Sequence, residues 1–254
     1  MQNSEFLKTG LEAAKKAEDI IMQHYDSGKL DTELKDDMSP VTIADKEAEK
    51  IIIETIRSRF PEHSILGEES GRDRNDSEYL WVIDPIDGTK NYMRKIPIFA
   101  IEIALMKDGE VIMGVSNAPV LKELLYAEKG KGAYLNGRKI TVSGTKELDK
   151  AYLCFGGLKH FKKRLDNLIR FSESAMACRG YGDFFGYHLI AQGKIDVMID
   201  CHTNIWDIAA MSIIVDEAGG KFTDIEGNQV TEKIDSALAT NGIMHDEVLR
   251  ILNE

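Results

Sequence analysis

The chain has 254 residues, and 43 acidic against 32 basic side chains give it a formal net charge of −11. The hydrophobic fraction of 43% and the charged fraction of 30% exclude a disordered or fibrous chain, and the length suits one large domain or two closely joined halves. The acidic balance argues against nucleic acid as a partner, because a phosphate backbone is repelled. A small anionic substrate would need its charge neutralised locally, most simply by metal ions.

The three cysteines, Cys154, Cys178 and Cys201, have neither zinc-ribbon nor redox-pair spacing. They indicate reduced thiols, as in a cytoplasmic protein, and packing explains them better than catalysis. The first residues do not form a basic stretch followed by an apolar run, so no signal peptide is expected. No apolar segment approaches the ~20 residues that span a bilayer. We therefore expect a cytoplasmic protein without a membrane partner.

Two amphipathic helices are predicted at the start of the chain, because apolar residues recur there at helical spacing. The first spans residues 5–25, and the second follows an N-cap at Thr42 and runs to about residue 60. Residues 29–40 between them are polar and are predicted to form a loop. Short apolar runs with intervening glycine-containing turns then predict an antiparallel meander, with strands at 64–66, 79–83, 97–106, 111–117, 123–127 and 132–135.

From about residue 150, apolar runs of strand type alternate with helical patterns, which predicts an α/β half. Its strands are expected at residues 151–155, 174–178, 197–200 and 221–223, and its helices at 160–171, 183–192 and 205–218. We find no internal repeat and no linker, so the two halves are expected to act as one unit.

Three short stretches concentrate carboxylates more than solubility requires. They are Gly67-Glu68-Glu69-Ser70, Asp84-Pro85-Ile86-Asp87-Gly88-Thr89 and Trp206-Asp207. Each alone has an ordinary explanation: the first can be a surface pair of glutamates, the second a solvated turn and the third a helix cap. Together they indicate a site.

The second stretch combines two kinds of ligand-binding feature. An apolar strand leads into Asp84, Pro85 predicts a turn that ends the strand, and Asp87 follows closely enough for both carboxylates to converge. Gly88 permits close approach of the backbone, and a helix beginning at Thr89 favours an anion. Carboxylate ligands for a hard cation such as Mg²⁺ thus lie beside a backbone cradle for phosphate.

These stretches resemble the motifs of the inositol monophosphatase superfamily, whose members are Mg²⁺-dependent, lithium-sensitive phosphatases of sugar and alcohol phosphates. The resemblance covers nearly the whole chain and keeps the order of the motifs. It implies a layered αβαβα sandwich, of α+β and α/β character, and usually a homodimer. Besides the stretches above, it includes Val41-Thr42-Ile43-Ala44-Asp45, Lys90-Asn91-Tyr92, Ile208-Ala209-Ala210 and Gly219-Gly220.

The resemblance also implies roles for individual residues of a single phosphatase unit, residues 1–254. An α+β half, 1–145, would carry the main metal site, and an α/β half, 146–254, would supply Asp207 and substrate contacts. The ligands of two or three Mg²⁺ ions would be Glu68, Asp84, the carbonyl of Ile86, Asp87 and Asp207. Gly88 and Thr89 would present N–H groups to the phosphate, Asp45, Thr89 and Glu68 would orient the attacking water, and Lys35 would approach the same end of the site.

The stretch Arg179-Gly180-Tyr181-Gly182-Asp183 is similar to the pattern of histidinol-phosphate phosphatases of this superfamily. Asp183 takes a position where inositol-specific members usually carry a small residue, and Asp200 falls where the family contacts the alcohol. Two carboxylates suit a cationic alcohol better than a neutral one, although a helix N-cap explains Asp183 equally well. The expected substrate-binding residues are Gly88, Thr89, Arg179, Gly182, Asp183, Asp200 and Asp207, with Arg179 serving the phosphate or ordering its loop.

We therefore predict a Mg²⁺-dependent phosphate monoester hydrolase that acts on L-histidinol phosphate, in histidine biosynthesis, by in-line attack of a metal-activated water. Inositol 1-phosphate and fructose 1,6-bisphosphate stay open as substrates, as does a broad range of sugar phosphates. The basic residues in 159–164 would be the candidates for binding a second phosphate. A degenerate regulatory scaffold also stays open, although the intact set of acids argues against it.

Overall fold

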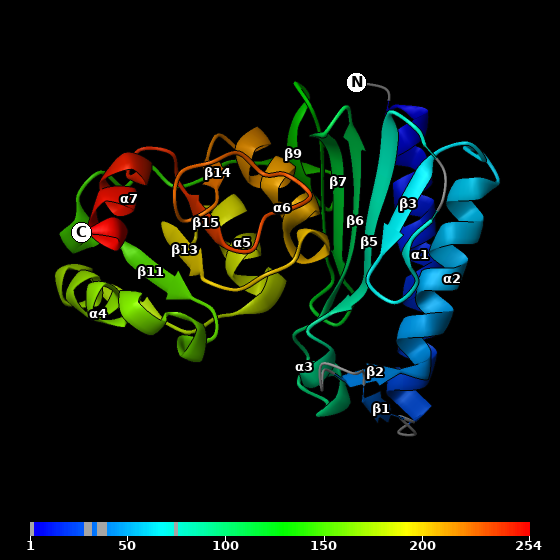
Figure 1. Ribbon diagram of the computed structural model, residues 1–254, viewed down its shortest axis with the longest axis horizontal. Coiled ribbons are helices and arrows are strands. Elements are labelled where there is room, and N and C mark those ends of the chain that lie inside the picture. The colour runs from blue at the N-terminus through cyan, green and yellow to red at the C-terminus, as the bar shows by residue number, and fades with distance from the viewer. Residues whose placement is uncertain (1–2, 28–31, 35–39, 74–75) are drawn as a thin grey trace.

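The computed structural model of the protein describes residues 3–27, 32–34, 40–73 and 76–254. Within these ranges the chain forms five layers, helix, sheet, helix, sheet and helix, which follow one another across Figure 1. The predicted αβαβα sandwich is thereby confirmed. The outer layers are α1 (Glu5–Ser27) with α2 (Ile43–Arg57) on one side, and α4 (Leu165–Ser174) with α7 (His245–Asn253) on the other.

The larger sheet has eight strands among the described residues, in the order β10-β9-β8-β7-β6-β5-β3-β4. From β5 to β9 it is the predicted antiparallel meander, and β10 adds a strand that was not predicted; β3, expected within the meander, instead pairs with β5 in parallel. One face packs against α1 and α2. The strands are β3 (Ser64–Gly67), β4 (Gly71–Arg72), β5 (Tyr79–Asp87), β6 (Ala100–Lys107), β7 (Glu110–Ala118), β8 (Glu123–Glu128), β9 (Gly132–Leu135) and β10 (Arg138–Ile140).

The smaller sheet, in the order β12-β11-β13-β15-β14, is parallel from β12 to β13 and antiparallel beyond. The chain passes from one sheet to the other after β10, and a division of function between residues 1–145 and 146–254 stays a prediction. The strands are β11 (Tyr152–Phe155), β12 (Ala177–Arg179), β13 (Val197–Asp200), β14 (Lys221–Thr223) and β15 (Ala237–Thr240). The middle layer consists of α5 (Asp183–Ala191) and α6 (Ile205–Glu217).

Helix α6 lies between the two sheets, and most of its side chains are buried. A helix covered on both sides has no need for a polar face, which explains its continuous apolar run. Gly114 of β7 lets the helix come close, because a Cβ at this position would lie 2.4 Å from the carbonyl oxygen of Ala210. This contact fixes α6, and the acidic residue in its first turn, against the larger sheet.

The strand β5 does not end before Pro85, so the predicted turn is wrong. The strand continues to Asp87, and its pairing with β6 shifts register between Asp84 and Asp87. Such an irregularity holds one extra residue and tolerates a proline that cannot donate an N–H to the neighbouring strand. The bulge turns the end of β5 without interrupting it.

Other elements differ from the prediction at their ends or were not predicted. The helix expected from residue 160 begins at Leu165, after two 3-10 turns (Leu158–His160 and Lys162–Arg164), and the strand expected from residue 174 begins at Ala177. Periodicity gave no sign of β4, β10, β15, α7 or the 3-10 turn Leu148–Lys150. In the expected polar loop, β1 (Thr32–Leu34) pairs with β2 (Pro40–Thr42), and the remainder lies outside the described residues.

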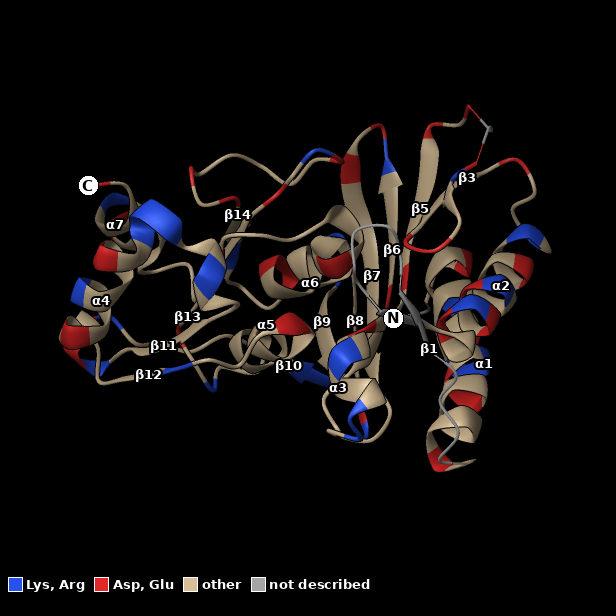
Figure 2. Cartoon of the chain, turned by 60° about the horizontal axis from the view of Figure 1, so that its bottom comes forward, with Lys and Arg blue, Asp and Glu red and all other residues tan. Residues whose placement is uncertain are grey.

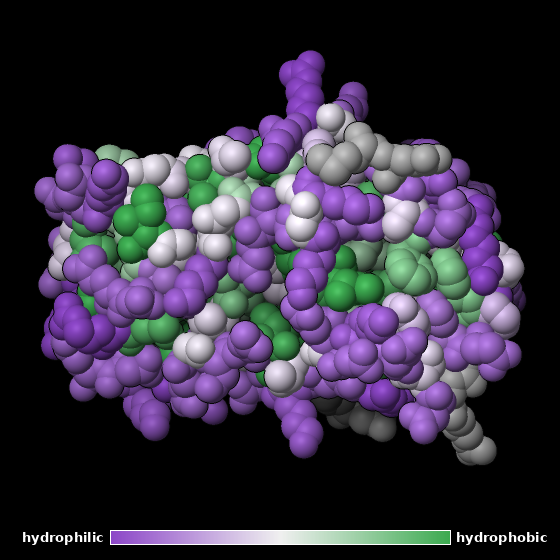
Figure 3. Space-filling model, turned by 90° about the horizontal axis from the view of Figure 1, so that it is seen from above, coloured by the Kyte–Doolittle hydropathy of each residue, from purple (hydrophilic) through white to green (hydrophobic). Residues whose placement is uncertain are grey.

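Hydrophilic residues cover most of the face seen in Figure 3, and the cysteines form no disulfide with one another. In the part of the chain that the structure describes, no helix is long and apolar enough to cross a bilayer. The three cysteines are free, and Cys154 is buried in the core.

We expect Gly114→Ala to lower the free energy of unfolding by about 1–3 kcal/mol, because the added methyl group presses on the backbone of α6. Gly144→Ala is the matched control, since a Cβ at position 144 meets no atom within 4 Å. Urea unfolding curves measure both variants. Equal free energies of unfolding for the two would contradict the close packing of α6 on β7.

Candidate active site

The predicted acidic residues, although far apart in the sequence, come together in one cleft. Glu68 directly follows β3, Asp84 and Asp87 lie near the end of β5, and Asp207 lies in the first turn of α6. The cleft has a volume of about 170 Å³. The other residues that line it are Ile86, Gly88, Thr89, Lys90 and Asp183.

Helix α3 (Thr89–Met93) begins at this cleft behind a glycine that no other residue replaces easily. Gly88 is its N-cap with a φ of 86°, and a Cβ there would lie 2.9 Å from the carbonyl oxygen of Ile98. Only glycine adopts this positive φ without strain and also leaves room for the carbonyl oxygen of Ile98. The backbone at the start of α3 therefore lines the cleft without a side chain at position 88.

Backbone N–H groups orient the three aspartates. The N–H of Ile86 donates to Asp84 Oδ1 at 2.9 Å, and the N–H of Phe184 donates to Asp87 Oδ2 at 2.6 Å. Asp207 Oδ2 accepts from the N–H of Asn204 at 2.7 Å. One oxygen of each carboxylate accepts this backbone hydrogen bond. The side chain is thereby held in place, and these backbone bonds do not involve its other oxygen.

The predicted N-cap of α2 is confirmed, and it aims Asp45 at the cleft. Thr42 and Asp45 form a capping box, in which the N–H of Thr42 donates to Asp45 Oδ2 at 2.8 Å. The other oxygen, Oδ1, lies 3.4 Å from the hydroxyl of Thr89, which is also 3.0 Å from the carbonyl oxygen of Ile86. Asp45 and Thr89, expected to act as a pair, thus lie within hydrogen-bonding distance.

Burial raises the pKa values of the three aspartates Asp84, Asp87 and Asp207, and the charges of neighbouring acids raise them further. Burial and the charges of Glu68, Asp87 and Asp207 raise the pKa of Asp84 well above its usual value. The pKa of Asp87 is also raised well above that value, by burial and then by Asp183 and Asp207. Burial, followed by the charge of Glu68, raises the pKa of Asp207 to about 6.

The donor set fits a hard cation. Carboxylate and carbonyl oxygens are the ligands that Mg²⁺ prefers, and a cation would relieve the repulsion that raises the pKa values. Among the residues that the structure describes, no three His, Cys, Asp or Glu side chains already stand close enough together to enclose a metal ion. Uncompensated carboxylates repel one another, so an open arrangement around a shared cleft is the expected one.

Of the two acids expected to contact the alcohol, Asp183 lines the cleft, whereas Asp200 does not line it and lies near Asp183 and Asp207. Asp183 is not the N-cap of α5, so that interpretation is wrong: Gly182 takes the cap position, and Asp183 follows it with a φ of 56°. Its Oδ2 accepts from Asn91 Nδ2 of α3 at 3.1 Å, and Figure 2 shows the acidic start of α5 beside α3. Burial, and then the nearby Asp183 and Asp207, raise the pKa of Asp200 to about 7.

Three of the expected residues are placed less directly. Arg179 is exposed, donates to the carbonyl of Cys178 at 2.7 Å, and does not line the cleft, which favours an ordering of the loop over a phosphate contact. Gly182 begins α5 without lining the cleft itself. Lys35 lies outside the described residues.

Sequence reasoning missed Glu49, which supports the loop that carries Glu68. Its carboxylate accepts the N–H groups of Glu69 at 2.9 Å and Ser70 at 2.8 Å. Gly67 leaves room for it, because a Cβ there would lie 2.5 Å from the Glu49 carboxylate. The signal available in the sequence was a glutamate on the apolar face of α2, four residues after Asp45. In the structure Glu49 is only 2% exposed.

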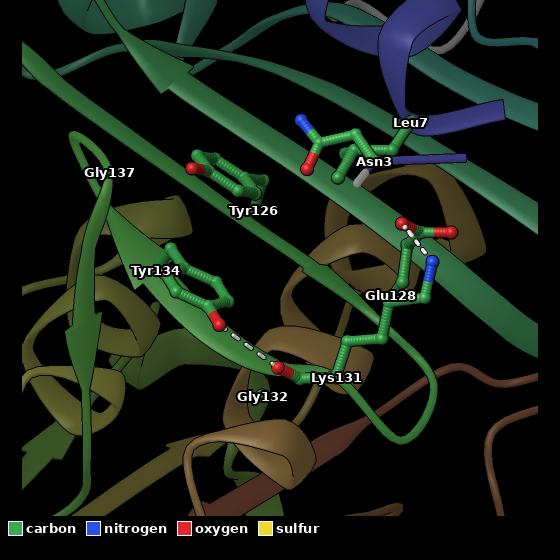
Figure 4. Close-up of a pocket in the computed structure, with 8 residues that line it drawn as sticks. All are labelled: Asn3, Leu7, Tyr126, Glu128, Lys131, Gly132, Tyr134 and Gly137. Atoms are coloured by element: carbon green, nitrogen blue, oxygen red, sulfur yellow. Dashed lines mark hydrogen bonds and ion pairs between the residues drawn. The ribbon is translucent and has the colours of Figure 1, made fainter. Parts of the chain in front are cut away.

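A second cavity, of about 210 Å³, lies at β8 and β9. Tyr126 and Tyr134 stack there with centroids 5.5 Å apart, and Lys131 bonds to Glu128 across it (Figure 4). Its only acid among the described lining residues is already paired, so it offers no set of oxygen ligands. The lining residues are Asn3, Leu7, Tyr126, Glu128, Lys131, Gly132, Tyr134 and Gly137.

Comparison with known proteins agrees with the geometry. Residues 2–254 match the model of the inositol monophosphatase family. The chain is 35% identical to a histidinol-phosphatase of Mycobacterium tuberculosis, with 97% of both chains covered. It is 36% identical to a fructose-1,6-bisphosphatase/inositol-1-monophosphatase of Thermotoga maritima, over 98% of this chain and 96% of that one.

Among solved structures, the extragenic suppressor protein suhB from Bartonella henselae superposes with a TM-score of 0.92 at 31% identity, over 99% of both chains. Both relatives named above are phosphatases by name, which confirms the predicted class of enzyme, a phosphoric monoester hydrolase, and argues against a degenerate scaffold. The chain therefore belongs to the inositol monophosphatase family.

Proposed function

We propose that this chain is a Mg²⁺-dependent phosphate monoester hydrolase whose substrate is L-histidinol phosphate. The observation that supports it most is the cleft, which is lined by carboxylates from the end of β3, from β5 and from α6 together with the glycine at the start of α3. A site for hard cations thus adjoins backbone that an anion can approach closely. The hydrolysis of a phosphate ester needs this combination, because the ester is negatively charged and resists attack.

The oxygen atoms around the cleft would hold two or three Mg²⁺ ions. The ligands would be Glu68, Asp84, the carbonyl of Ile86, Asp87 and Asp207. When bound, the ions would supply positive charge to the ester and the departing alkoxide and would lower the pKa of a bound water. The N–H bonds to Asp84, Asp87 and Asp207 keep these side chains directed to the cleft before any cation arrives.

Thr89 and Asp45 are proposed to orient the attacking water together with Glu68. The Thr89 hydroxyl lies between two acceptors, Asp45 Oδ1 and the carbonyl of Ile86. Its proton is directed to one of them, so an oxygen lone pair remains to accept a hydrogen bond from water in the cleft. The N–H groups of Gly88 and Thr89 would bind the phosphate oxygens, as the resemblance implies.

Two acids favour a cationic alcohol as the group released. Asp183 lines the cleft, and Asp200 lies close enough for the charge of one to raise the pKa of the other. The ammonium and imidazole of histidinol would pair with these carboxylates, whereas a neutral polyol would leave them uncompensated. The likeness to a histidinol-phosphatase over nearly the whole chain adds support.

Fructose 1,6-bisphosphate is the second candidate, because basic groups extend from the cleft. His160 lies near Lys159, Lys162 and Lys90 of the cleft. Burial, then His202, and then the charges of these lysines lower its pKa. A second phosphate would find positive charge there. Inositol 1-phosphate is the third candidate, and the relative with both activities in its name keeps these two open. Phosphate release from the three esters, with and without Mg²⁺, ranks them.

The resemblance adds three further proposals about the enzyme. They are inhibition by lithium, assembly as a homodimer and a place in the cytoplasm. Activity against LiCl concentration and sedimentation of the purified chain test the first two directly.

We expect added Mg²⁺ to stabilise the protein more at pH 8 than at pH 5. In the folded protein the pKa of Asp45 and of Asp207 is about 6 and that of Asp200 about 7, against the ordinary 3.8. Without metal, their contribution to stability is complete below pH 3.8 and is lost as the pH rises through 6 to 7. Mg²⁺ would bind ionised Asp207, and its positive charge would favour the ionised forms of Asp45 and Asp200 nearby, so it would oppose this loss.

The measurement is Tm with and without Mg²⁺ at the two pH values. The difference between Tm with and without Mg²⁺ at one pH removes the contribution of other titrating groups. One of these is His245: its pKa in the folded protein is about 4, below the ordinary 6.5, so it adds stability as the pH rises towards 6.5. An equal increase of Tm at pH 5 and pH 8 would contradict the proposed cation site.

Asp87→Asn should reduce kcat by a factor on the order of 100 or more, since the loss of an outer-shell partner alone costs about 10–100-fold. Asparagine keeps an acceptor for the Phe184 N–H and removes only the charge, so the fold should persist. Steady-state kinetics in a Mg²⁺ titration measure it, with Asp149→Asn on the surface as the control. Wild-type turnover in the Asp87 variant would refute the metal-ligand role.

The pair Asp183→Ser and Asp200→Ala should raise KM for L-histidinol phosphate by about 10–100-fold, as expected when charge-assisted hydrogen bonds are lost. KM for inositol 1-phosphate should change less, because a neutral alcohol has no charge to pair. The wild-type enzyme should prefer histidinol phosphate. Preference for the inositol ester, or equal changes of KM for both esters, would count against histidinol phosphate as the substrate.

A further inference from the structure

A buried chain of hydrogen bonds runs between the larger sheet and α5. Ser116 Oγ donates to Glu102 Oε1 and lies 2.6 Å from Nε2 of His188, whose Nδ1 lies 3.1 Å from Glu123 Oε2. Glu102 is 1% exposed, and Ser116 and His188 are fully buried. The chain reaches solvent only at Glu123, where it is joined by Gln192 at 3.0 Å.

These residues connect α5 to three neighbouring strands, because Glu102 lies in β6, Ser116 in β7 and Glu123 at the start of β8. Apolar packing alone tolerates sliding of a helix along a sheet, whereas directional hydrogen bonds in a dry interior do not. His188, with both ring nitrogens bonded to the sheet, therefore fixes the position of α5 along its own axis.

The start of α5 is part of the cleft. Phe184 precedes His188 by one helical turn, and their rings meet edge to face with centroids 4.8 Å apart. The N–H of Phe184 holds Asp87, and its neighbour Asp183 lines the cleft. Any displacement of His188 would be carried through Phe184 to Asp87.

Glu102 brings the other end of the chain to the same place. It is the partner of Asp84 in the pairing of β5 with β6, so both side chains lie on the face that α5 and α6 cover. Its Oε2 is buried and has no hydrogen-bond partner among the described residues. The charge of Glu102 also acts on Asp87, whose pKa it helps to raise.

A serine, a histidine and a glutamate in this order resemble a nucleophilic triad, but access excludes that function. Ser116 and His188 have no exposed surface, and neither lines the cleft. A substrate could not reach the hydroxyl without separation of α5 from the sheet. The chain is placed to hold a neighbouring site rather than to react.

We propose that the chain Glu102–Ser116–His188–Glu123 positions the start of α5 for cation binding, with His188 as the central positioning residue. By fixing α5 against β6, β7 and β8, it holds the Phe184 N–H on Asp87 and Asp183 at the edge of the cleft. The inference rests on the proposed function for the identity of the cation, Mg²⁺.

The test compares His188→Gln with His245→Gln. His245 is also buried with both ring nitrogens bonded, to Thr223 and Thr240 at 3.0 Å each, but it is the first residue of α7 and bonds to strands of the smaller sheet. The Tm of the two variants should fall by similar amounts. Only His188→Gln should weaken Mg²⁺ binding, by about tenfold, as for other outer-shell residues. Calorimetric titration of substrate-free protein with MgCl₂ measures it.

A second pair of variants covers the case in which His188→Gln does not fold. Ser116→Ala removes the middle of the chain, and Ser212→Ala removes a buried hydroxyl that only bonds within α6. Only the former should weaken Mg²⁺ binding. In the wild-type protein, side-chain ¹⁵N signals of His188 should shift on addition of Mg²⁺, whereas those of His245 should not.

The outcomes separate two failures. If the wild-type protein binds no Mg²⁺, the proposed function fails. If it binds Mg²⁺ but the His188 and Ser116 variants bind it as their controls do, or the His188 signals do not move, the positioning role is overturned while the proposed function stands.

Discussion

Mutual repulsion between buried carboxylates is the constraint on which the rest of the structure depends. Asp84 and Asp87 are only 2% and 8% exposed, and burial, followed by the charges of neighbouring acids, raises both of their pKa values. Removing such charges from water opposes folding unless they are protonated or compensated. Backbone N–H groups compensate in part by bonding one oxygen of each. The negative charge that these N–H groups leave uncompensated destabilises the cation-free protein and thereby favours cation binding.

Helix starts are the device that holds the acids in place. Asp45 in α2 and Asp207 in α6 both take the third position of a capping box, where N–H groups and the helix dipole favour an ionised carboxylate. Their pKa values rise only to about 6. Asp84 and Asp87 lie in a strand, and burial followed by the charges of neighbouring acids raises their pKa values well above the usual one. Burial is the largest cause for all four acids, and the hydrogen bonds at the starts of α2 and α6 offset part of it for Asp45 and Asp207.

Local signals in the sequence were sufficient for the features that depend on neighbouring residues. The cap at Thr42, the apolar run of β5 and the glycine at position 88 belong to this class. Features decided by distant residues were missed: β6 sets the register that carries β5 through Pro85, Glu49 bonds to a loop 20 residues away, and His188 bonds to Ser116 across 72 residues. The acids of the cleft were predicted because several weak sequence patterns agreed. The residues that hold them in place, such as Glu49 and His188, leave no local pattern in the sequence.

Asp183 shows how the two ends of the site are joined. Its φ of 56° is one that glycine adopts without strain, and another residue typically incurs a cost of about 1–3 kcal/mol. The structure tolerates this conformation because the side chain bonds to Asn91 of α3. The same short helix begins at Gly88, beside the acid cluster. A shift of α3 would therefore change both ends of the cleft together, so under the proposed function recognition of the phosphate and recognition of the alcohol would be mechanically linked.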